Sequence, residues 1–150
     1  MNQSQNFVAL WKEGRTRFSN LLSSITDADL KKKLGDAPNS VGFLIRHIAD
    51  VELLFAKNVF GIADVQVHAK TVMAKKDTGE WTNLQELLQY QQVAFETLQK
   101  AIESQAEASW EQIVTTKEFG TKTKSEALGR ITTHSAYHAG QLAIIVKYGR

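Results

Sequence analysis

Apolar residues recur at alternating spacings of three and four along most of this 150-residue chain, as expected where one face of a helix is buried. Four segments show this period. Their stripes are Phe7, Trp11, Gly14, Phe18, Leu21 and Ile25; Val41, Leu44, Ile45, Ile48, Phe55 and Val59; Leu84, Leu88, Gln91, Phe95, Leu98 and Ile102; and Ala127, Ile131, His134, His138, Gln141, Leu142 and Ile145. The pattern predicts an all-α protein, an antiparallel four-helix bundle around a shared core.

Cap and turn signals separate these segments. Ser4 and Ser40 are the expected N-caps of the first two helices, and Thr123 with Glu126 forms a capping box for the fourth. Residues 61–80 lose the helical period, which predicts a long irregular connection that serves as a lid, a pocket wall or a mobile loop. Residues 113–121 weakly resemble a short hairpin.

Composition narrows the class of protein. With 43% hydrophobic and 23% charged residues, the chain is expected to form one domain over residues 1–150. The net charge is only +2 and the basic residues are scattered, which argues against a nucleic-acid partner. No apolar run approaches the roughly 20 residues of a membrane span, and the polar N-terminus lacks a signal-peptide core, so the cytoplasm is the expected compartment. Because the chain has no cysteine, a metal ion would need histidine, carboxylate or water ligands.

Histidines in the helical stripes are the first candidates for a functional site. His134 and His138 lie one turn apart on one helix face, a spacing that lets two imidazoles bind one ion. His47, at the edge of the second stripe, is a candidate third ligand, although an imidazole in such a place can equally bond water or a carbonyl group. Three imidazoles would leave a coordination position for water or substrate, as in catalytic zinc sites.

Other polar residues in or near the stripes have less specific interpretations. Glu52, Gln91 and Gln141 are candidates for contacting a metal ligand or lining a pocket. Glu52 lies about 140° around its helix from His47, which favours an ion pair or an orienting contact over direct ligation. We expect Asp50 to be a solvated charge on the polar face and His68 to be a solvated residue of the irregular connection.

Two segments resemble motifs of the DinB-like (YfiT-type) superfamily of metal-binding four-helix bundles. Segment 39–50, NSVGFLIRHIAD, is similar to the family's Ser-Ile-Gly-Trp-Leu-x-x-His, and segment 134–141, HSAYHAGQ, is similar to its His-x3-His-x-Gly-Gln. The resemblance covers nearly the whole chain in helix order. It implies that His47, His134 and His138 are ligands of one divalent ion, commonly nickel or zinc.

The family's activities are varied, and some relatives are transferases or isomerases that use low-molecular-weight thiols. The resemblance therefore implies a metal-dependent enzyme of the thiol-dependent transferase or hydrolase type, acting on a small molecule. Such a thiol is one expected partner, and a homodimer is one assembly that the resemblance allows. The alternative is a non-catalytic metal-binding or stress-associated module in which the ion braces the bundle.

Overall fold

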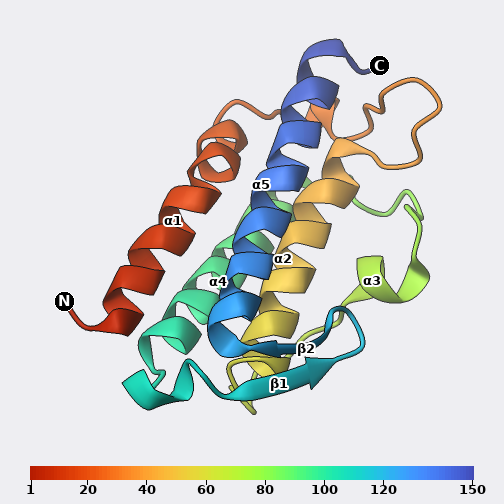
Figure 1. Ribbon diagram of the computed structural model, residues 1–150. Coiled ribbons are helices and arrows are strands. Elements are labelled where there is room, and N and C mark those ends of the chain that lie inside the picture. Colours follow the sequence, from red (N-terminus) through yellow and green to blue (C-terminus); the bar gives the residue numbers. More distant parts are fainter.

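The computed structural model describes residues 1–150 and shows four long helices beside three short ones and a small hairpin (Figure 1). The long helices are α1 (Gln3–Leu22), α2 (Val41–Asn58), α4 (Leu84–Glu103) and α5 (Lys124–Tyr148). The short elements are η1 (Asp27–Asp29), α3 (Lys70–Ala74), η2 (Glu107–Ser109), β1 (Ile113–Thr116) and β2 (Gly120–Thr123). The predicted four-helix bundle is confirmed.

Two of the predicted helix caps are correct and one is wrong. The Ser40 hydroxyl accepts the backbone N–H of Phe43, and Thr123 forms its capping box with Glu126. In α1, however, the cap is Asn2. Ser4 is buried instead, where its hydroxyl accepts a hydrogen bond from Trp110 Nε1 at 2.9 Å and donates to a carbonyl oxygen. Its hydroxyl is therefore used in the core contact between α1 and the segment after α4.

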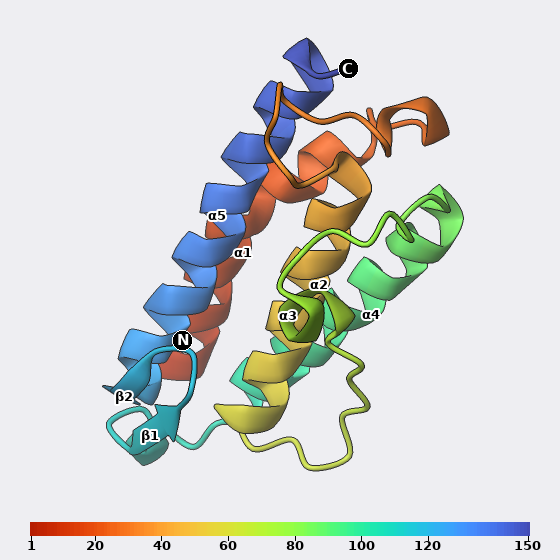
Figure 2. The same cartoon turned by 90° about the vertical axis from the view of Figure 1, so that its right-hand side faces the viewer.

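The helices pack in the cyclic order α1, α5, α2, α4, with α1 and α2 on one diagonal. Two helices run in each direction along the bundle axis (Figures 1 and 2). Neighbours α1 and α4 are antiparallel, as are α2 and α5, whereas α1 runs parallel to α5 and α2 runs parallel to α4. The bundle therefore contains two parallel neighbouring pairs as well as two antiparallel ones.

This direction of the helices explains the long connection between α2 and α4. Both helices run the same way, so the chain must return along the bundle after α2 before α4 can begin. The 18 residues of α2 span about 27 Å at 1.5 Å per residue. The connection, which contains α3, covers this distance along the outside of α2 (Figure 2).

The chain passes from α4 to α5 through a two-stranded hairpin, in agreement with the sequence pattern. Strands β1 and β2 are antiparallel, and their register pairs Ile113 with Thr123 and Thr116 with Gly120. Gly120 has φ +74°, a left-handed conformation that glycine adopts without steric cost. Two clusters of buried apolar side chains, of 18 and 14 residues, fill the bundle. None of the helices has the combined length and apolar character needed to cross a membrane.

Candidate metal centre

Helices α2 and α5 bring the three candidate histidines together. One ring nitrogen from each of His47, His134 and His138 lies within 4.8 Å of the others. The Nε2 atoms of His47 and His134 are 3.2 Å apart. Two nitrogens that each lie about 2.0–2.1 Å from a tetrahedral ion are about 3.3 Å apart, so this pair has the spacing that a shared ion requires. The donor set consists of imidazoles alone, which suits zinc, nickel, copper or iron.

Burial keeps these imidazoles neutral. Loss of solvent, followed by repulsion from His138, lowers the pKa of His47 to about 4, although the nearby Asp50 carboxylate opposes this shift. Burial also lowers the pKa of His134 to about 3, with further repulsion from the other two histidines and Arg130. The pKa of His138 is lowered by burial as well. Since a histidine must be neutral to bind a metal ion, the site holds its candidate ligands in the competent form at neutral pH.

Gln141, one of the predicted supporting residues, contacts a candidate ligand directly. Its Oε1 atom lies 2.6 Å from Nδ1 of His138. An amide oxygen can only accept, so Nδ1 of His138 carries the proton and its Nε2 keeps the lone pair. The corresponding Nδ1 of His134 is buried and has no hydrogen-bond partner.

His47 is supported by residues that the sequence pattern did not indicate. Its Nδ1 atom lies 3.2 Å from the hydroxyl of Thr71, which belongs to α3 in the long connection. The Thr71 hydroxyl is 2.6 Å from Oδ2 of Asp50, and the Thr71 N–H donates to the same oxygen. Thr71 lies in an aperiodic segment, so no periodic signal could have placed it beside α2.

The expectation that Asp50 is a solvated charge is wrong. Its side chain is completely buried, and its other oxygen, Oδ1, accepts hydrogen bonds from Arg46 Nε at 2.9 Å and from the Tyr90 hydroxyl at 2.6 Å. The Arg46 guanidinium stacks on the Tyr90 ring, 3.6 Å from its centroid. Burial, and then the hydrogen bond to Asp50, raises the pKa of Tyr90, which therefore remains a hydrogen-bond donor. The connection and α4 thus cover the part of α2 that the sequence pattern assigned to solvent.

Glu52 and Gln91 lie together, but neither forms a hydrogen bond with a histidine. Both bind the buried guanidinium of Arg15: Glu52 accepts from Nε at 2.7 Å and from Nη2 at 3.0 Å, and Gln91 Oε1 accepts from Nη2 at 3.0 Å. Glu52 also accepts a longer bond from Ser135. The ion-pair interpretation of Glu52 thus matches its position. Arg15 itself was missed, although its place four residues after Trp11 and three before Phe18 put it on the same buried face.

The remaining histidine, His68, lies outside the cluster. His68 is exposed, as expected. Its backbone carbonyl, but not its imidazole, joins the hydrogen bonds around Asp50, by accepting from Arg46.

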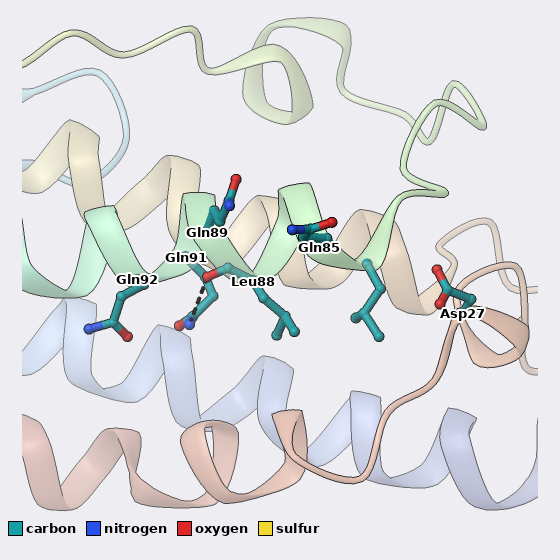
Figure 3. A pocket seen from close by; sticks show the side chains of 7 residues that line it. Asp27, Gln85, Leu88, Gln89, Gln91 and Gln92 are labelled. Atoms are coloured by element: carbon teal, nitrogen blue, oxygen red, sulfur yellow. Dashed lines mark hydrogen bonds between the residues drawn. The ribbon is translucent and has the colours of Figure 1, made fainter.

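Two cavities lie beside the long helices, and no histidine lines either of them. One, of about 530 Å³, lies along α4 near the turn after α1 and contains no histidine (Figure 3). Gln91 lines it, together with Gln85, Gln89 and Gln92. The other, of about 730 Å³, is bounded by α2, the α3 region and the hairpin. Its lining includes Leu54, which lies on the same face of α2 as His47 but about 10 Å further along the helix axis.

The fold and the site define a four-helix bundle with a three-histidine cluster between two facing helices. The model of the DinB superfamily matches residues 10–142, and the chain belongs to that family. No curated protein matches the sequence.

Solved structures share the fold at low sequence identity. A DinB-like protein from Bacillus subtilis has a TM-score of 0.70 at 18% identity, over 95% of this chain and 90% of its own. YfiT from Bacillus subtilis, described as a probable metal-dependent hydrolase with an unusual four-helix bundle topology, has a TM-score of 0.71 at 13% identity, over 97% and 86%. A mycothiol-dependent maleylpyruvate isomerase has a TM-score of 0.70 at 21% identity, over 93% of this chain but only 60% of its own.

Proposed function

We propose that this protein binds one divalent ion, nickel or zinc, through His47, His134 and His138, and uses it as a metal-dependent transferase or hydrolase. The observation that carries the proposal is the convergence of three neutral imidazoles from two helices, with ring nitrogens within 4.8 Å of one another. The all-histidine cluster also fits the composition of the chain. The chain has no cysteine and therefore no thiolate with which to bind such an ion.

A bound divalent ion would supply the chemistry by lowering the pKa of a water molecule or a thiol, which makes a nucleophile at neutral pH. The chain's own residues would hold and orient the ligands. Gln141 fixes the proton of His138 on Nδ1, so that Nε2 is available to the ion. The three histidines contribute no negative charge, which would favour deprotonation of a water molecule or thiol at a remaining coordination position of the ion.

The position of Glu52 favours a catalytic over a bracing role. A structural zinc site is closed by four protein ligands, whereas a catalytic site has three and keeps one position open. Glu52 is the one carboxylate among the residues predicted to support the ligands, and both of its oxygens bind Arg15. The cluster of candidate ligands therefore contains three residues and no carboxylate.

We propose that the substrate is a small molecule such as a low-molecular-weight thiol or a hydrolysable ester or amide. Two similar structures support this choice of chemistry, since one is described as mycothiol-dependent and the other as a probable metal-dependent hydrolase.

Metal analysis of protein purified without added metal tests the first part of this proposal. We expect about one divalent ion per chain in the wild type and in a His68→Ala control, and little in a His134→Ala, His138→Ala double variant. Equal metal content in the control and the double variant would contradict ligation by this cluster.

Activity tests the second part. Thiol-acceptor pairs and small esters and amides should be screened with the metal-loaded and the chelated protein. We expect turnover only in the loaded form and its loss in His138→Gln. Turnover that is equal in both forms and survives His138→Gln would exclude metal catalysis, and metal binding without any turnover would favour the bracing role.

A further inference from the structure

A continuous chain of hydrogen bonds runs from α4 through α2 and α3 to the metal centre. Tyr90 and Arg46 donate to Oδ1 of Asp50, Thr71 donates to Oδ2, and the Thr71 hydroxyl is 3.2 Å from Nδ1 of His47. Asp50 is completely buried and Thr71 is 2% exposed, so water does not compete with these contacts. We infer that Asp50 and Thr71 are positioning residues that fix the tautomer and the ring orientation of His47 for the ion. The inference rests on the proposed function.

The positions of the protons follow from the donors around Asp50. Its two oxygens face the Arg46 guanidinium, the Tyr90 hydroxyl, and the N–H and hydroxyl of Thr71, all of which can donate. A carboxylate accepts from all four, so the single proton of the Thr71 hydroxyl points to Oδ2, where the distance is 2.6 Å.

The contact between Thr71 and His47 must then use a proton from the imidazole. The hydroxyl has donated its only hydrogen to Asp50, so its oxygen accepts from Nδ1–H of His47. This places the lone pair of His47 on Nε2, the atom 3.2 Å from Nε2 of His134. The other tautomer would set the lone pair of Nδ1 against that of the hydroxyl oxygen.

This arrangement gives the irregular connection a role in the site. Thr71 lies in α3, on the path by which the chain returns from α2 to α4. The connection is held to α2 by the two hydrogen bonds from Thr71 to Asp50 and by the bond from Arg46 to the carbonyl of His68. The connection between α2 and α4 therefore carries the Thr71 hydroxyl, which orients His47 on α2.

The test compares Thr71→Val, which keeps the shape but removes the hydroxyl, with Thr71→Ser, which keeps the hydroxyl. Zn²⁺ and Ni²⁺ affinities should be measured by competition with a chromophoric chelator. We expect Thr71→Val to bind about 10- to 100-fold more weakly, as is usual when the partner of a metal-binding histidine is lost. Thr71→Ser should bind within a few-fold of the wild type. Thr16→Val, on the outer side of α1, controls for loss of a helical threonine hydroxyl.

The ¹⁵N chemical shifts of the His47 ring report the tautomer in the metal-free protein, and a purely structural role for Thr71 would not change them. We expect Nδ1–H in the wild type and in Thr71→Ser, and a mixture of tautomers in Thr71→Val. Wild-type affinity in Thr71→Val, or Nε2–H in the wild-type protein, would overturn the inference. The wild-type measurement decides the matter even if Thr71→Val does not fold. Absence of metal binding by the wild type would instead refute the proposed function and leave the tautomer result intact.

Discussion

The Arg15–Glu52 ion pair lies inside the bundle, and we expect it to be sensitive to removal of either charge. The side chains of Arg15 and Glu52 are 3% and 0% exposed, and two hydrogen bonds of 2.7 and 3.0 Å join them. The guanidinium also faces the rings of Phe18 and Phe95 at 4.8 and 4.9 Å. Glu52→Gln keeps the shape of the side chain but leaves the positive charge without a counterion.

Breaking a buried ion pair by removal of one partner typically costs about 3–5 kcal/mol. We expect the lower end, about 3 kcal/mol, because the amide oxygen of the new side chain and Gln91 Oε1 can still accept from Arg15. For a chain of this length 1 kcal/mol corresponds to roughly 2–4 °C in Tm, so the expected decrease is about 6–12 °C. The Zn²⁺ affinity should remain at the wild-type value, since Glu52 forms no hydrogen bond with a histidine.

Urea unfolding followed by circular dichroism, in the presence of chelator, measures this effect. Glu13→Gln is the matched control, because Glu13 is an exposed residue on the same helix as Arg15, and it should change the free energy of unfolding by less than about 0.5 kcal/mol. A double variant, Arg15→Met with Glu52→Leu, should recover much of the loss, since no charge is then buried. The reasoning is refuted if Glu52→Gln unfolds within 1 kcal/mol of the control, or if it weakens Zn²⁺ binding while stability is unchanged.

Three further predictions concern the metal, pH and the packing of Trp81 against α2. Chelation should lower Tm yet leave the helical circular dichroism intact at 25 °C, because two apolar clusters of 18 and 14 residues hold the helices together; loss of the helical signal would contradict this. In the chelated protein, His47 and His134 have a pKa of about 4 and about 3, against 6.5 when unfolded. Below pH 6.5 the unfolded chain thus takes up protons that the folded chain does not. The free energy of unfolding should therefore fall by about 1–2 kcal/mol per histidine between pH 7 and pH 5. An equal fall in a His47→Gln, His134→Gln double variant would show that these two histidines are not its cause. Gly42→Ala should cost about 1–3 kcal/mol in urea unfolding, because its Cβ would lie 1.9 Å from the Trp81 carbonyl oxygen. The control Gly129→Ala meets no atom within 4 Å and should be neutral or stabilising.

Features of the protein that depend on local periodicity could be predicted from the sequence. The four stripes predicted the four long helices because one face of each is buried along its whole length. The same reasoning placed His134 and His138 on the inward face of one helix, where the structure has them. The position of Gln141 beside His138 also follows from a spacing of three residues within one helix.

Features that depend on how separate elements dock could not be predicted in this way. A charged residue beside a buried stripe, such as Asp50, is solvated or buried according to what covers it, and here the cover is Tyr90 from α4 and Thr71 from α3. The Arg15–Glu52 pair likewise joins two helices whose relative position the stripes do not define. Ser4 was assigned as a cap because its residue type favours that role, but a partner more than 100 residues away in sequence, Trp110, binds its hydroxyl.

The directions of the helices explain why a residue of the long connection lies beside His47. Since α2 and α4 are parallel neighbours, the chain between them has to travel back along the bundle, and it does so against α2. His47 lies on α2 with one ring nitrogen facing α5 and the other facing this returning segment. A tight turn between antiparallel helices would leave that second nitrogen to water. The length of the connection is therefore required by the topology, and its passage over α2 supplies the hydroxyl that orients His47.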